Sequence, residues 1–409
     1  MRLPPVVASL FDANMRRCLP IGRRHWERAA VLAVFCVAVP FPASGQMERW
    51  TLERTITIGD AMGSEAGLTR VGTVIVRDDR LIVTQPRERR LRIFSLIGDF
   101  LGFIGRDGEG PGEFRAVGRM GLLADGRLWV HDPQLQRIQH FDLAGRVVST
   151  ERVRDHPALR GWGSVRGLLE DGSQLVWYSA SSSELVKSPQ LPEPVVRFPE
   201  DGQPPDTVAM IVGRNDILAL SDGTAGVRVL ALHPLSYRSR LAVGADGSGF
   251  VVVHRTGATS DERHTYSVIG FDGRADTAWV REVPYDPVRI PEGWRQRRVE
   301  ERIGYPDRLH PSVSERHFRN VLKRAYGGRA FFPPVELVVR AAAEGTTWLR
   351  LRTGVESSEW EVLDKFGRSV ARVDLPRGSI NWIGRESVWV TERDELDISY
   401  LVRYVIHRP

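Results

Sequence analysis

Short apolar runs separated by polar turns recur along most of the chain. Six places show two apolar runs joined by a tight turn, at Asp78-Asp79, Asp125-Gly126, Asp171-Gly172, Asp246-Gly247, Glu344-Gly345 and Arg385-Glu386. Such runs are typical of antiparallel strands, and Asp-Gly suits the hairpin because glycine accepts positive φ at little cost. The pattern therefore predicts an all-β fold made of six similar units.

A second glycine turn follows in five of the six units, at Gly98, Gly145, Gly202, Gly273 and Gly367. Two hairpins give four strands, which is the size of a propeller blade. The sixth unit ends after its third strand, residues 399–406, whereas residues 50–58 form a strand without a unit. We therefore predict a six-bladed β-propeller in which the N-terminal strand completes the last blade and removes the open edge. Two separate β-sandwiches are the alternative.

Residues 287–334 interrupt this rhythm and are predicted to be a partly helical insertion. The spacing Ser312 to Glu315 is that of a capping box, and Gly327-Gly328 ends the helix. One apolar face follows from Phe318, Val321, Leu322 and Ala325. A weaker, arginine-rich helix is expected over residues 292–303. Because the apolar face needs a partner, we expect the insertion to pack on one face or the rim of the ring.

The first 45 residues differ from the rest. Arginines precede a short apolar run, residues 29–41, and small residues follow at Ala43 and Gly45. This order predicts a secretory signal peptide over residues 1–45, cleaved before Gln46, with the propeller over residues 46–409. An uncleaved membrane anchor is the alternative, and Met15 is an alternative start. After cleavage we expect a secreted or periplasmic protein without stable membrane insertion.

Removing that segment changes the charge and cysteine content. Both cysteines, Cys18 and Cys36, lie within it, so the mature chain has neither a disulfide nor a cysteine nucleophile. The segment holds six arginines and two acidic residues, which leaves 51 basic and 49 acidic residues in the remainder. The two signs are interspersed rather than clustered, which argues against nucleic acid as a partner.

Several motifs resemble NHL-repeat propellers. They are GRDGEGPGEF at residues 105–114, LADGRLWV at 123–130 and RIQHFD at 137–142. The chain is more closely similar to secreted bacterial six-bladed β-propeller proteins of unassigned function, whose last blade resembles residues 388–404. The resemblance extends over about residues 50–409 and is sharpest in 71–153 and 379–406. It implies the fold and export, with binding as the usual role.

Candidate binding residues gather in the glycine-rich loop 105–114 and nearby. Its carboxylates could bind calcium, or could pair locally with arginines. An arginine-flanked aromatic in another glycine-rich loop suits sugars, peptides or a protein surface, and Trp294, Tyr305 and Tyr326 are expected to be further exposed aromatics. The candidate ligand-binding residues are Arg106, Glu109, Glu113, Arg115 and Trp162.

The remaining chemistry in the sequence is sparse. None of the nine histidines after residue 45 forms an HxH or HExxH pair, and no serine lies in a G-x-S-x-G elbow. We therefore expect no catalytic residues, no metal site and no cofactor. The preferred function is a non-enzymatic propeller that binds a small ligand, glycan, peptide or protein through loops at one end of its channel. The alternatives are a metal-dependent propeller enzyme, lactonase-like hydrolase or lyase, and an envelope scaffold that docks through residues 287–334.

Overall fold

The computed structural model describes residues 47–409 except 60–65, 143, 157–158, 160–161, 181–190, 212–216, 220–229, 234, 256, 304–312, 343–344, 356 and 376–377. Met47–Pro409 forms one compact unit. The predicted signal peptide and both cysteines lie outside the described residues. Within the described part of the chain, no helix combines the length and apolar character needed to cross a membrane.

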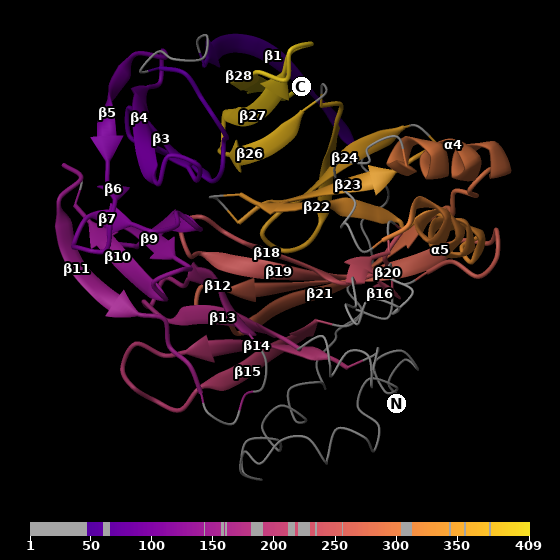
Figure 1. The fold of residues 1–409 in the computed structure, drawn as a ribbon, viewed down its shortest axis with the longest axis horizontal. Coiled ribbons are helices and arrows are strands. Elements are labelled where there is room, and N and C mark those ends of the chain that lie inside the picture. The colour runs from indigo at the N-terminus through magenta and orange to yellow at the C-terminus, as the bar shows by residue number, and fades with distance from the viewer. Residues whose placement is uncertain are drawn as a thin grey trace. The chain divides into compact units, whose positions relative to one another are not determined.

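The strands group into six blades, numbered here in chain order (Figure 1). Blade one is β2 (Val74–Arg77), β3 (Arg80–Gln85), β4 (Arg90–Ser95) and β5 (Phe100–Ile104), and blade two is β8 (Met120–Leu122), β9 (Leu128–Asp132), β10 (Arg137–Phe141) and β11 (Val147–Arg152). Blade three is β12 (Trp162–Leu168), β13 (Gln174–Ser179), β14 (Glu193–Phe198) and β15 (Asp206–Ile211), and blade four is β18 (Arg240–Val243), β19 (Gly249–His254), β20 (His264–Asp272) and β21 (Thr277–Tyr285).

Blade five is β22 (Val335–Ala341), β23 (Thr347–Arg352), β24 (Ser358–Leu363) and β25 (Ser369–Val373). Blade six is β26 (Ser379–Ile383), β27 (Ser387–Arg393), β28 (Ser399–His407) and β1 (Glu48–Ile58). Two short pairs lie between blades: β6 (Arg106–Asp107) with β7 (Glu113–Phe114), and β16 (Ile217–Ala219) with β17 (Leu230–Leu232).

The N-terminal strand completes blade six, as the sequence predicts. β1 pairs antiparallel with β28, from Thr51 opposite His407 to Ile58 opposite Leu401. It also begins two residues earlier than predicted, and Glu48–Trp50 pair in parallel with β25 of blade five. This second pairing was not predicted. It joins blades five and six into one eight-stranded sheet, because the start of β1 extends past the end of β28.

Six buried apolar clusters join the blades into a closed circuit, since each contains side chains from two neighbouring blades. Representative members are Ile82 and Phe141, Ile138 and Tyr178, Trp177 and Phe250, Val253 and Leu349, Trp348 and Val390, and Trp389 and Leu81. The last cluster returns from blade six to blade one. The alternative of two separate sandwiches is therefore wrong.

The hairpin turns have the expected backbone at most of the predicted positions. Gly126, Gly172 and Gly247 have φ of +83°, +77° and +72°, which explains the Asp-Gly pairs. The second turn of blade four differs. There Ala275, and not Gly273, has the positive φ of +68°.

Strand direction distinguishes the two ends of the ring. Because blade strands alternate in direction, each fourth strand ends where the next blade's first strand begins. We call this the crossover end. By chain order it carries the segment 105–119, Trp162 at the start of β12, the insertion after β21 and the start of β26. The turns between the first and second strands of a blade, such as Asp125-Gly126, and those between its third and fourth strands lie at the opposite end.

The insertion is helical where predicted. α4 (Glu292–Ile303) and α5 (Glu315–Gly327) follow β21, and the predicted apolar face of α5 is buried. The N-cap is Ser314, whose hydroxyl accepts from the His317 amide, and not Ser312, which lies outside the described residues. Ser314 takes this role because it directly precedes the first helical residue.

The insertion packs against segments of blades four and five. Its core contains Leu235, which precedes β18, and Phe332, which precedes β22. Trp294 and Tyr326 were expected to be exposed, but they are 6% and 3% exposed. Their rings meet edge to face at 5.7 Å and so form the core of the insertion. Tyr305 lies outside the described residues.

Candidate functional site

Four of the predicted site residues form two ion pairs in one loop, at the crossing from blade one to blade two. Arg106 Nη2 lies 2.7 Å from Glu113 Oε1, and Arg115 Nε lies 3.1 Å from Glu109 Oε1. The Gly110 amide and the Arg106 guanidinium hold the pKa of Glu113 below its ordinary value. The carboxylates are therefore neutralised locally by arginines, as one of the two interpretations of this loop predicts.

Residues of blade two hold the backbone of this loop. Arg137 donates to the carbonyls of Glu109 at 2.6 Å and of Gly110 and Glu113 at 2.9 Å. The buried Asp132 accepts from the amides of Arg115 at 2.8 Å and Ala116 at 3.2 Å. The loop is thus fixed by internal hydrogen bonds, and we call the whole arrangement the crossing network.

Trp162 lies on a different blade. It is the first residue of β12 in blade three and is 79% exposed. The structure therefore places it at the crossover end as predicted, but outside the crossing network. An exposed tryptophan is available to a ligand or partner at that end.

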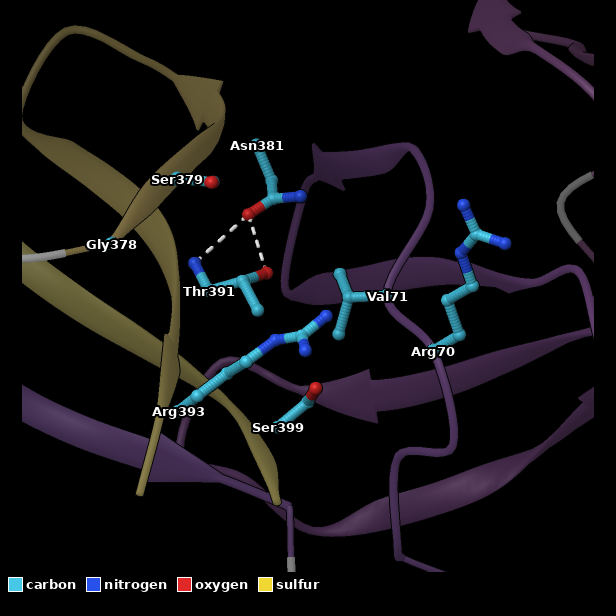
Figure 2. A pocket seen from close by; sticks show the side chains of 8 residues that line it. All are labelled: Arg70, Val71, Gly378, Ser379, Asn381, Thr391, Arg393 and Ser399. Carbon is cyan, nitrogen blue, oxygen red and sulfur yellow. Dashed lines mark hydrogen bonds between the residues drawn. The ribbon is translucent and has the colours of Figure 1, made fainter. Parts of the chain in front are cut away.

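A polar pocket of about 440 Å³ lies between blades six and one, also at the crossover end (Figure 2). Its lining residues are Arg70, Val71, Gly378, Ser379, Asn381, Thr391, Arg393 and Ser399. Asn381 Oδ1 accepts from the Thr391 amide at 2.9 Å and from its hydroxyl at 2.6 Å. Its Nδ2 donates to Gly72 O at 3.2 Å. Asn381 therefore joins the last blade to the segment before the first.

The charged groups of the pocket are arginines. Figure 2 shows Arg393 pointing between Thr391, Val71 and Ser399, with Arg70 on the other side of Val71. Arg393 Nη1 also donates to Asp397 at 2.6 Å. Gly378 has φ of +152°, and a Cβ there would lie 2.5 Å from Val390 Cγ1. Glycine thus permits this backbone at the pocket wall.

A second arginine-rich region surrounds Trp177. The guanidinium carbons of Arg166 and Arg238 lie 4.1 and 4.2 Å from the centroid of its ring. Glu193 Oε2 accepts from Arg238 Nη2 and from Trp177 Nε1, both at 3.1 Å. The side chains of Arg238, Trp177 and Glu193 are buried.

Two further arginines extend this region across three blades. Arg119 precedes β8 in blade two, and Arg240 begins β18 in blade four. Burial, then the charges of Arg119 and Arg238, lower the pKa of Arg166 to about 9, and the charge of Glu193 opposes the shift. Burial and Arg238 lower the pKa of Arg240 to about 10, and burial lowers that of Arg119. Arg166 and Arg240 therefore stay protonated at pH 7. We call Arg119, Arg166, Arg238 and Arg240 the arginine cluster.

The sequence analysis missed both the pocket and the arginine cluster. The pocket combines residues about 300 positions apart, as the Asn381–Gly72 contact shows. The cluster did leave a signal in the repeats. Arg119 and Arg240 each precede the aspartate of their hairpin turn, Asp125 or Asp246, by six residues, and Arg166 precedes Asp171 by five. Alignment of the units by their turns would have brought these arginines together.

Two histidines at the crossover end lie in largely buried surroundings. Burial lowers the pKa of His131 to about 4; the charge of Asp132 opposes this shift, and that of Arg119 adds to it. His254 Nδ1 lies 2.9 Å from Ser239 Oγ, and burial lowers its pKa. Among the residues with described positions, no group of three or more His, Cys, Asp or Glu side chains is arranged to hold a metal.

Residues 64–185 match the model of the DUF5128 family, described as a 6-bladed beta-propeller. The strand topology and this match identify the chain as a β-propeller. The search of curated proteins found no match.

Solved structures that resemble the chain include a protein from Bacteroides fragilis that is provisionally described as exported. It has 13% identity and a TM-score of 0.43, and the match covers 87% of this chain and 95% of that protein. A member of the duf4221 family from Bacteroides vulgatus has 8% identity, 89% and 99% coverage and a TM-score of 0.48. Virginiamycin B lyase from Staphylococcus aureus has 12% identity, 87% and 99% coverage and a TM-score of 0.38. Similarities this distant assign neither a ligand nor an activity.

Proposed function

We propose that the protein is a secreted or periplasmic, non-enzymatic binding propeller that holds a small polar ligand at its crossover end. The observation that carries this proposal is the pocket of about 440 Å³ between blades six and one. Ligand sites in proteins typically have volumes of roughly 300–1,000 Å³ and a few well-placed polar groups. Export and membership of the NHL-type group belong to the same proposal and rest on residues 1–45 and on the motifs of blades one and two.

The lining groups suggest the ligand class. Ser379 and Ser399 supply hydroxyls, which donate and accept hydrogen bonds. Arg393 supplies a guanidinium group that favours a carboxylate, whereas the Arg70 guanidinium points away from the other lining side chains (Figure 2). A hydroxylated ligand with one carboxylate, such as an acidic monosaccharide, satisfies both. Because hydroxyl, amide and guanidinium groups bind and orient a ligand, binding is the function that this site supports best.

Calorimetric titration with galacturonate tests the proposal, with galactose as the uncharged comparison. We expect galacturonate to bind more tightly than galactose, and Arg393→Gln to weaken galacturonate binding about tenfold, since it removes a charge-assisted hydrogen bond. Arg80→Gln, at the β2–β3 turn, is the matched control and should bind as the unaltered protein does.

Two results would contradict this function. One is the absence of binding across acidic and neutral monosaccharides. The other is equal binding by Arg393→Gln and the unaltered protein. Stoichiometric zinc or calcium retained through dialysis would instead favour the metal-dependent enzyme.

A further inference from the structure

In the part of the protein that the structure describes, the arginine cluster gathers four guanidinium groups around one ion-paired carboxylate, Glu193. Its four guanidinium groups come from blades two, three and four, and Glu193 is the carboxylate that pairs with Arg238. Within the described part of the chain, Arg119, Arg166 and Arg240 form no ion pair, and the Nε atoms of Arg166 and Arg240 are buried without a hydrogen-bond partner. Like charges gathered in partly desolvated surroundings are unfavourable unless a counter-charge is present.

The local backbone is arranged to present these side chains together. Val165 pairs with Val176 and Gly167 with Leu175, so Arg166 is the extra residue of a β-bulge in β12. Bulges commonly redirect a side chain out of the regular ladder, and they recur beside functional sites. The first strands of blades two, three and four are neighbours, because β12 contacts β8, and a Cβ added at Gly167 of β12 would lie 2.7 Å from Val243 Cγ1 of β18.

Another buried arginine shows how this protein uses the residue structurally. Arg255 donates from Nε to Arg238 O and from Nη1 to Val335 O, both at 2.8 Å, and from Nη2 to Ser236 O. Its donors are thus taken up by backbone carbonyls. The guanidinium carbon of Arg166 instead lies over the Trp177 ring, and Arg166 Nε has no acceptor among the described residues. The same residue type therefore binds the backbone in one place and is left available in the other.

Solvent and a ligand can reach the cluster. The Arg119 side chain is exposed, and Arg166 and Arg240 are partly exposed, although burial by surrounding protein lowers the pKa of each. Ser164 pairs directly opposite Trp177, and Trp162 is two residues before Ser164. Trp162 therefore shares that face of blade three and lies nearer the crossover end.

We propose that the arginine cluster is a binding site for a multivalent oxyanion, a polycarboxylate or a phosphate or sulfate group, held by Arg119, Arg166 and Arg240. The oxyanion supplies the missing counter-charge and accepts hydrogen bonds from the guanidinium groups. Trp162 offers an apolar ring to whatever the anionic group is attached to. This site consists of blades two to four and is independent of the pocket between blades six and one.

Thermal unfolding and calorimetric titration with citrate, inorganic phosphate and sulfate test this site at pH 7 and constant ionic strength. We expect at least one of the three anions to raise the unfolding midpoint above that in sodium chloride of equal ionic strength. Comparing the three anions shows whether the site prefers a carboxylate, a phosphate or a sulfate group. Arg119→Gln and Arg240→Gln should each lower the affinity for that anion about tenfold, because each removes one charge-assisted hydrogen bond. Arg127→Gln, at the opposite end of blade two, is the matched control and should change the affinity less than twofold.

The outcomes separate this proposal from the preceding one. Arg393→Gln should bind the anion normally, because its pocket lies on other blades. The anion site is wrong if none of the three anions stabilises the protein beyond sodium chloride. It is also wrong if Arg119→Gln and Arg127→Gln bind the anion equally well. Arg119 is the variant of choice because its exposed side chain can be changed without opening the core.

Discussion

In the crossing network, Arg106 and Arg115 each lie within 3.1 Å of a carboxylate. In the arginine cluster, Arg119, Arg166 and Arg240 have no such partner among the described residues, although Glu193 pairs with Arg238 at 3.1 Å. Both regions lie at the crossover end and are rich in arginine. The first balances its charge within ten residues of sequence, and the second assembles its charge from three blades.

This difference indicates that the crossing network has a structural role, whereas the arginine cluster is a candidate binding site. The paired charges of the crossing network keep its loop in shape. Charges of one sign that converge from separate elements raise the local potential and favour an opposite ion. The motif at residues 105–114, which resembles NHL-repeat propellers, thus forms the crossing network. The residues of the arginine cluster lie in no such motif.

The largest effect on stability is expected when the carboxylate of Glu193, which pairs with Arg238 of the arginine cluster, is removed. Glu193→Gln keeps the shape of the side chain and a carbonyl acceptor, but leaves Arg238 buried beside like charges. We expect the free energy of unfolding to fall by about 3–5 kcal/mol, as for other broken buried pairs. Urea denaturation at pH 7, followed by tryptophan fluorescence, measures it. An unchanged midpoint would show that Glu193 does not balance the cluster, and the contrast between the two regions would be lost.

The second prediction concerns His131, which lies near Arg119 and beside Asp132. Its pKa of about 4 in the folded protein is below the ordinary 6.5. Between these values the unfolded chain takes up a proton that the folded protein excludes. The free energy of unfolding should therefore fall as the pH drops from 6.5 to 4, by roughly 2–3 kcal/mol from this residue, and level off below.

Urea midpoints between pH 7 and pH 4 check this prediction. His131→Asn should flatten the decline relative to the unaltered protein. The matched control is His407→Asn, because His407 is exposed and pairs with Glu53 at the far side of β1. Equal slopes for His131→Asn and the unaltered protein would show that burial and Arg119 do not suppress protonation at this position.

The sequence predicts the ring because its signals are local. Asp125-Gly126 and similar turns specify hairpins through glycine φ, and the orphan strand at each end of the propeller region specifies closure through β1 and β28. The arginine cluster depends on which faces of β8, β12 and β18 meet, and on a one-residue bulge at Arg166. Neither is encoded in a short window. The exposure predicted for Trp294 was wrong for the same reason, because its burial depends on α5 and Phe332.

The smallest effect is expected for the matched change in the crossing network, Glu113→Gln. Glu113 pairs with Arg106, whose side chain is 80% exposed, and it accepts from the Gly110 amide at 2.8 Å. The glutamine carbonyl can still accept from Gly110, and exposed ion pairs contribute little to stability. The urea midpoint should therefore stay within experimental error of the unaltered protein.

The same substitution at Glu193 and at Glu113 thus compares the two regions directly. Arg137 and Asp132 hold the loop backbone without Glu113, so its charge is dispensable. In the arginine cluster, Glu193 is the carboxylate that forms an ion pair among the residues whose positions are described. Equal destabilisation by both variants would mean that the crossing network also depends on its ion pairs. The proposed difference between the crossing network and the arginine cluster would then be wrong.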